Sequence, residues 1–89
     1  MKCVCIDDEK VFRNEIDKVI DRYRNRNKVQ IEMRFYEKPE LLLYDLKEWE
    51  TYDLYILDIG LGGDMNGLSL AGEIRKLDEN ARIVFLTSY

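Results

Sequence analysis

Four oxygen-bearing side chains stand at the ends of apolar runs in this sequence, where parallel strands would bring them to one edge of a sheet. Asp7 and Asp8 end the first run, Asp58 interrupts an otherwise apolar run, and Thr87 closes the last. Carboxylates gathered in a partly dry pocket repel one another, and a divalent cation offsets that repulsion; oxygen ligands with retained waters suit magnesium. A carboxylate beside magnesium is a nucleophile for phosphoryl groups, so Asp58 is a candidate aspartyl-phosphate. The Thr87 hydroxyl would then hydrogen-bond a phosphoryl oxygen.

A glycine-rich turn follows Asp58 in the stretch YILDIGLGGDMNG, and it raises the alternative of a loop that cradles phosphate with backbone N–H groups. The dinucleotide fingerprint G-x-G-x-x-G begins at Gly60 but has Met65 at its last position, and no Gly-Lys-Ser/Thr end of a Walker loop is present. We therefore interpret the glycines as leaving room beside Asp58. Taken singly, Asp7 or Asp8 has a structural interpretation as a turn former or helix cap. The combination of carboxylates at one predicted sheet edge favours function.

Hydrophobic periodicity predicts strands that alternate with helices along the chain. Continuous or alternating apolar runs indicate strands, and apolar residues at helical spacing indicate helices. The predicted strands are residues 1–6, 29–35, 54–59 and 83–87, and the predicted helices are residues 9–26, 39–49 and 67–77. This order predicts an α/β fold with an open parallel sheet and helices on both faces, in one small domain over residues 1–89.

The pattern within each element predicts its buried face. Residues 29–35 alternate between apolar and polar side chains, which is typical of an edge strand, whereas residues 54–59 are typical of a strand buried on both faces. The first helix has an apolar face of Phe12, Ile16, Val19, Ile20 and Tyr23. The second, with Pro39 in its first turn, has a stripe of Leu42, Leu46 and Trp49, widened by Leu41, Leu43 and Tyr44. The third, capped by Asn66, would face inward with Leu68, Ala71, Ile74 and Leu77.

Composition excludes several classes of function. The formal net charge is −4 and the pI is about 4.8, which argues against nucleic-acid binding by this segment. No apolar run is long enough to span a membrane, and the N-terminus does not resemble a signal peptide. Cys3 and Cys5 lie on one face of a predicted strand and are interpreted as small buried hydrophobes in a reducing, cytoplasmic compartment. The chain has no histidine, which removes the usual acid–base residue.

With these motifs, the sequence resembles the receiver domain of a two-component response regulator. It most resembles receivers joined to LytTR-type DNA-binding domains. The matching stretches are VCIDDE, YILDI, MNG and IVFLTS. The resemblance spans all 89 residues. It implies a flavodoxin-like sheet with strand order 2-1-3-4, truncated here after the fourth strand.

The resemblance also implies a role for each site residue. Asp58 would be the phosphoacceptor and Thr87 the switch hydroxyl. Asp7 or Asp8, more so Asp8, would bind magnesium together with Asp58 and the backbone carbonyl of Gly60. The phosphoryl donor would be a sensor histidine kinase or a small phosphodonor. The output would pass to an effector domain outside this chain, which the resemblance implies to be DNA-binding. The domain would itself not be an enzyme.

Three departures from the family pattern leave alternatives open. Gly62 replaces a common proline, and the turn glycine Gly67 comes one residue late. The elements after the fourth strand, with the lysine that contacts the phosphoryl group, are absent, which suggests a fragment of a longer regulator. An exposed sheet face and a free fourth-strand edge would then favour a dimer or higher oligomer. The alternative function is a phosphorylation-independent interaction module; an aspartyl-phosphate phosphohydrolase would need an aspartate where Gly60 stands.

Overall fold

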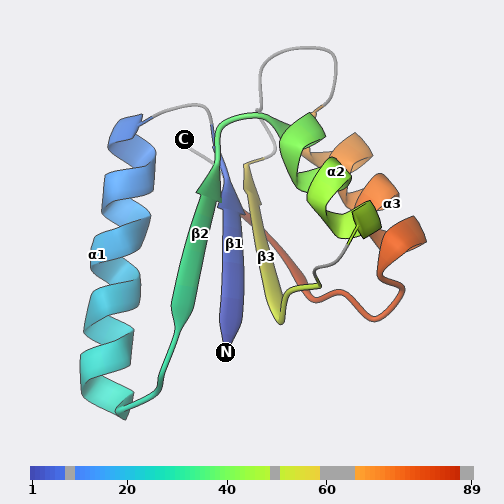
Figure 1. Cartoon of the computed structure of the whole chain (residues 1–89). Coiled ribbons are helices and arrows are strands. Elements are labelled where there is room, and N and C mark those ends of the chain that lie inside the picture. Colours follow the sequence, from blue (N-terminus) through green and yellow to red (C-terminus); the bar gives the residue numbers. More distant parts are fainter. Residues whose placement is uncertain (8–9, 49–50, 59–65, 87–89) are drawn as a thin grey trace.

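The chain folds into alternating strands and helices, as the periodicity predicted. A computed structural model describes residues 1–7, 10–48, 51–58 and 66–86, with residues 10–12 described by their backbone alone (Figure 1). The elements are β1 (Lys2–Ile6), α1 (Lys10–Asn27), β2 (Glu32–Tyr36), α2 (Pro39–Glu48), β3 (Leu54–Asp58), α3 (Gly67–Leu77) and β4 (Ile83–Leu86). No helix in these described ranges is long and apolar enough to cross a membrane.

The strands form one parallel sheet in the order β2-β1-β3-β4, which confirms the predicted strand order and the edge position of β2. Two pairs set the register at the carboxyl end of β1: Ile6 lies opposite Tyr36 of β2 on one side and opposite Leu57 of β3 on the other. In β4, Leu86 pairs with Asp58. The carboxyl ends of all four strands therefore lie along the same edge of the sheet.

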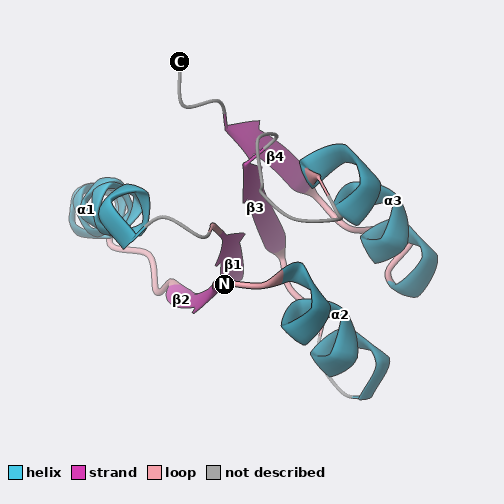
Figure 2. Cartoon of the chain, turned by 90° about the horizontal axis from the view of Figure 1, so that it is seen from above, coloured by secondary structure: helices cyan, strands magenta, loops and turns pink. Residues whose placement is uncertain are grey.

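Helices cover both faces of the sheet, but unequally. α2 and α3 lie on one side and α1 lies alone on the other (Figure 2). The main core is between the sheet and the α2–α3 pair, and it is built from inward-facing side chains of β1, β3 and both helices. Its fully buried members are Val4, Ile6, Leu42, Tyr55, Leu57, Leu70 and Ile74. At about 25 cal/mol per Å² of buried apolar surface, this layer is the chief source of stability.

The second strand begins later than predicted. Residues 29–31 are not strand. They lie beside the start of β1, where the Met1 amino group donates to the Gln30 carbonyl at 2.9 Å and Glu32 N donates to the Met1 carbonyl at 2.8 Å. Pairing with β1 starts only at Glu32. The predicted alternation nevertheless holds, because Ile31 is buried and Met33 is half-buried.

The predicted stripes of α2 and α3 need correction. In α2, Leu42 and Leu46 are buried as predicted, but Leu41 and Tyr44 are exposed; Trp49 lies outside the described residues.

In α3 the buried face is Gly67, Leu70 and Ile74, whereas Leu68 is 60% exposed. The Asn66 cap is confirmed, because its Oδ1 accepts from Ser69 N at 2.8 Å. The cap fixes where the helix begins, with Leu68 as its second residue.

α1 has fewer neighbours than the other helices. Of its predicted apolar face, Ile16 and Ile20 are half-buried, but Val19 and Tyr23 are more than half exposed. The helix is followed by Lys28, whose φ of 52° is left-handed. Among the described elements, α1 is the one helix on its side of the sheet (Figure 2), which accounts for this exposure.

Candidate phosphoacceptor site

Asp7 and Asp58 lie side by side at the carboxyl edge of the sheet. Asp58 is the last residue of β3, and Asp7 directly follows β1. Ile6 pairs with Leu57, so the residues that follow them, Asp7 and Asp58, are neighbours. Neighbouring parallel strands are about 4.8 Å apart, so the two carboxyl groups share one small region. Asp7 is fully buried and Asp58 is 8% exposed.

Strand alternation puts both aspartates on the α1 side of the sheet. Side chains of β1 point alternately to the two faces, so Asp7 shares its face with Cys5, and Asp58 shares its face with Ile56. Cys5 pairs with Phe35 of β2, and Phe35 lines a hollow with residues of α1. The acidic side chains therefore lie on the opposite face from the α2–α3 core.

The backbone around Asp7 is held by β2. Asp7 N donates to the Tyr36 carbonyl at 3.1 Å, which continues the β1–β2 ladder by one residue. The Tyr36 hydroxyl donates to the Asp45 carboxylate of α2. Asp7 thus stands on a backbone segment that is tied to the sheet and, through Tyr36, to a helix.

The Cys5 thiol lies on the same face of the sheet as the two aspartates, and its pKa responds to their charge. Burial raises the pKa of the Cys5 thiol to about 12, with further raising by the carboxylates of Asp7 and Asp58 and a lowering by the Arg13 guanidinium. Cys3 and Cys5 are both free and buried, as the sequence predicted. With so high a pKa, Cys5 is an inert core thiol beside the acidic pair and not a nucleophile.

Arg13 of α1 is a functional candidate that sequence reasoning missed. Its Nη2 lies 3.3 Å from Glu37 Oε1, one residue beyond the end of β2. The spacing could have revealed it, because an arginine in the first turns of a helix that follows an acidic pair lies near the same sheet edge.

The remaining predicted site residues, Asp8, Gly60 and Thr87, lie outside the described residues. Within the ranges that are described, no group of three or more acidic, cysteine or histidine side chains could by itself hold a metal ion. The structure therefore brings together Asp7 and Asp58, and the assignment of the other ligands stays a prediction.

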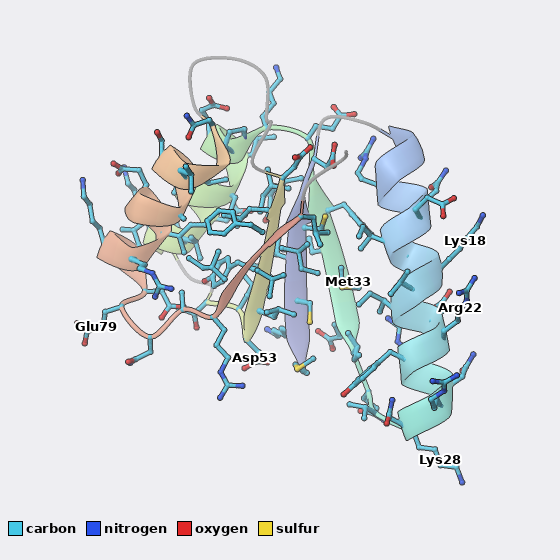
Figure 3. All side chains as sticks on the ribbon, turned by 180° about the vertical axis from the view of Figure 1, so that it is seen from behind. Lys18, Arg22, Lys28, Met33, Asp53 and Glu79 are labelled. Atoms are coloured by element: carbon cyan, nitrogen blue, oxygen red, sulfur yellow. The ribbon has the colours of Figure 1, made fainter. Side chains whose placement is uncertain are left out.

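A second polar cluster, also missed from the sequence, lies near the opposite end of β3. The buried Tyr55 hydroxyl accepts from Tyr52 N at 3.1 Å and donates to Asp78 Oδ2 at 3.0 Å. Burial raises the pKa of Tyr55 to about 12. Nearby, Asp53, labelled in Figure 3, accepts from Lys2 N at 2.7 Å. A tyrosine inside an apolar strand needs a partner for its hydroxyl, which was the available signal.

Comparison with known protein families assigns the chain to a family. Residues 3–89 match the response regulator receiver domain family. The chain belongs to the receiver domain family of response regulators. Two kinds of relative agree with this membership. The sensory transduction protein LytR of Staphylococcus saprophyticus is 35% identical over 89 residues, which are all of this chain and 33% of that protein. The accessory gene regulator protein A of Staphylococcus epidermidis is 37% identical over 87 residues, which are 97% of this chain and 36% of that protein.

Solved structures confirm the receiver fold. The N-terminal domain of a response regulator/sensory box/GGDEF protein from Carboxydothermus hydrogenoformans superimposes with a TM-score of 0.84 at 22% identity, covering 100% of this chain and 66% of that one. RcsB from Salmonella enterica serovar Typhimurium, bound to promoter rprA with phosphomimetic BeF3−, gives a TM-score of 0.78 at 20% identity, with 100% and 70% covered. This chain spans about a third of the length of the curated relatives it matches.

Proposed function

We propose that this receiver domain accepts a phosphoryl group on Asp58 and passes the resulting signal to an effector domain, as part of a two-component system. The observation that carries the proposal is the adjacency of Asp58 and Asp7, both buried, at the carboxyl edge of a receiver sheet. It acts as a signalling module, not as an enzyme with a substrate of its own. The resemblance to receivers of LytTR-type regulators supports a DNA-binding effector, and we propose a cytoplasmic location.

The chemistry is a phosphoryl transfer between nucleophiles. Response regulator receivers are phosphorylated by sensor histidine kinases, and we propose the same donor class here. A carboxylate oxygen of Asp58 forms a bond to phosphorus as the P–N bond of the phosphohistidine breaks, and the leaving imidazole takes up a proton. The sheet edge holds Asp58 in place for this step because β3 pairs with β1 on one side and β4 on the other.

The residues at this edge fit a magnesium ion. Two buried carboxylates on neighbouring strand ends supply the hard oxygen ligands that magnesium prefers. When bound, magnesium neutralises charge on the phosphoryl oxygens and on the acceptor. We propose Asp7, Asp8, Asp58 and the Gly60 carbonyl as its ligands, and Thr87 as the hydroxyl that hydrogen-bonds the phosphoryl group.

Intact-mass measurement tests the proposal. The chain is incubated with magnesium and acetyl phosphate, alongside Asp58→Asn, which keeps the shape of the side chain but removes the nucleophile. We expect one phosphoryl adduct on the wild-type chain and none on Asp58→Asn. An adduct that persists in the variant would move the acceptor elsewhere. Absence of any adduct would favour the alternative, a receiver-like module that works by interaction without phosphorylation.

A further inference from the structure

The charge balance at the carboxyl edge points to a residue outside the proposed ligand set. Asp7 and Asp58 are buried next to each other, and bringing two carboxyl groups together costs free energy unless a positive charge is near. Arg13 is half-buried, with a side chain 21% exposed, and it stands on α1, which lies on the same side of the sheet as both aspartates.

Two contacts and the strand register locate Arg13 in the fold. It lines a hollow of about 170 Å³ together with Phe35, and Phe35 pairs with Cys5, two residues before Asp7. Its Nη2 is 3.3 Å from the carboxylate of Glu37. Continuing the β1–β2 register by one residue places Glu37 opposite Asp7. Arg13 therefore lies at the carboxyl end of β2, next to the strand end that carries Asp7.

The ion pair with Glu37 compensates the positive charge of Arg13 only in part. The Glu37 side chain is 63% exposed, so the pair is a partly solvated one and is weak. Arg13 Nε is buried and has no hydrogen-bond partner among the described residues. Asp17, on the next turn of α1, lines the same hollow.

We propose that Arg13 is a positioning residue of the acid pocket: its guanidinium, tethered by Glu37, offsets the charge of Asp7 and Asp58 in the metal-free domain and thereby sets how tightly the pocket binds a divalent cation. The proposal rests on the proposed function of that pocket. A fixed positive charge that stabilises the empty pocket competes with magnesium, because both compensate the same carboxylates. Removing the charge of Arg13 therefore strengthens magnesium binding while it destabilises the metal-free domain.

The first test measures magnesium affinity by isothermal titration at ~0.1 M salt, where charges beyond about 10 Å are largely screened. We expect Arg13→Gln to bind magnesium about threefold more tightly than wild type, as the loss of one nearby charge implies. Arg22→Gln is the matched control, because it removes the same charge from α1 at a side chain that points away from the sheet (Figure 3). It should leave the affinity unchanged. Arg13→Lys, which keeps the charge, should stay close to wild type.

The second test needs no metal. Urea unfolding in chelator compares Arg13→Gln in the wild-type background and in the Asp58→Asn background. We expect a clear drop in the urea midpoint in the first background and a smaller drop in the second, because one of the carboxylates that Arg13 compensates has gone. Arg22→Gln should have the same small effect in both.

The two tests separate this inference from the proposed function. If wild type binds magnesium but Arg13→Gln behaves like Arg22→Gln in both tests, the inference is overturned and the proposed metal site stands. If wild type binds no magnesium yet the urea midpoints show coupling between Arg13 and Asp58, the role of Arg13 in charge compensation stands and the metal site is wrong. Weaker magnesium binding by Arg13→Gln would also overturn the inference.

Discussion

At the residue scale, the main feature is a small set of charged side chains at the carboxyl ends of the strands. Asp7 and Asp58 could be picked from the sequence because each stands at the end of an apolar run, and the parallel sheet does bring these two together. The spacing after the acidic pair marks Arg13 as a candidate, but its contact with Glu37 could not be predicted, because that contact depends on the angle at which α1 lies over the end of β2. That angle depends on packing between elements far apart in the chain, which periodicity does not report.

At the residue scale, the Tyr55 hydroxyl offers a direct test of the polar cluster near the start of β3. Tyr55→Phe leaves the Tyr52 N–H and the Asp78 carboxylate without the partner that Tyr55 supplies. We expect it to lower the free energy of unfolding by about 1–2 kcal/mol, because a buried donor loses its acceptor. Urea denaturation at neutral pH measures the loss. A stability equal to wild type would show that the hydroxyl contributes nothing.

The raised pKa values of Cys5 and Tyr55 predict the alkaline behaviour of the domain. Both groups are neutral when buried, and burial raises the pKa of each to about 12, above the ordinary values of 9.0 for Cys and 10.0 for Tyr. The stability that they contribute is full below pH 9 and is lost as the pH rises towards 12, because the unfolded chain releases these protons first.

Urea midpoints measured from pH 8 to pH 12 should therefore fall steadily above pH 9. The slope should be shallower in Cys5→Ala between pH 9 and 10, before the tyrosine begins to contribute. An identical slope in Cys5→Ala would contradict the assignment of that proton release to Cys5.

At the scale of elements, the sequence predicted the kind and order of every helix and strand but not the rotation of each helix about its axis. α3 shows why: the sequence predicted a stripe with Leu68, Ala71 and Ile74, whereas packing against the sheet buries Leu70 and Ile74 and leaves Leu68 exposed. The late start of β2 was not predicted either: pairing with β1 begins only at Glu32, and the Met1 amino group bonds to Gln30 before it. Such contacts between distant segments are not visible in a local pattern.

One helical position is open to stabilisation. Gly72 stands inside α3, and a Cβ built there would meet nothing within 4 Å. Gly72→Ala should raise the free energy of unfolding by about 0.5–1 kcal/mol, because alanine loses less backbone entropy in a helix. Thermal and urea denaturation measure the gain. A free energy of unfolding below that of wild type would contradict this prediction.

At the scale of the whole molecule, the unequal covering of the sheet is the main feature. In the part of the chain that the structure describes, α1 is the one helix on its face, and β4 forms one edge of the sheet with Val84 43% exposed. The sequence predicted this bare face from the resemblance to receivers. Exposed apolar side chains on an open strand edge are sites of association.

We therefore predict that the chain self-associates through β4 and its exposed face. Sedimentation over a range of concentrations should give a mass that rises above the monomer, and Val84→Glu should return it to the monomer. Leu41→Glu places the same charge at an exposed leucine of α2 and should leave association intact. A monomer mass at every concentration would contradict the prediction.

The claim that most needs a direct test is that the ends of β1 and β3 form one cation-binding, phosphoryl-accepting pocket. Manganese, a paramagnetic substitute for magnesium, broadens the NMR signals of nearby amides. Titrated into the labelled chain, it should broaden the amides of Asp7 and Asp58 first and leave Lys2 and Leu54, at the opposite ends of the same strands, sharp; excess magnesium should reverse the broadening. Broadening centred on Lys2 and Leu54, or spread evenly over the acidic surface, would contradict the account.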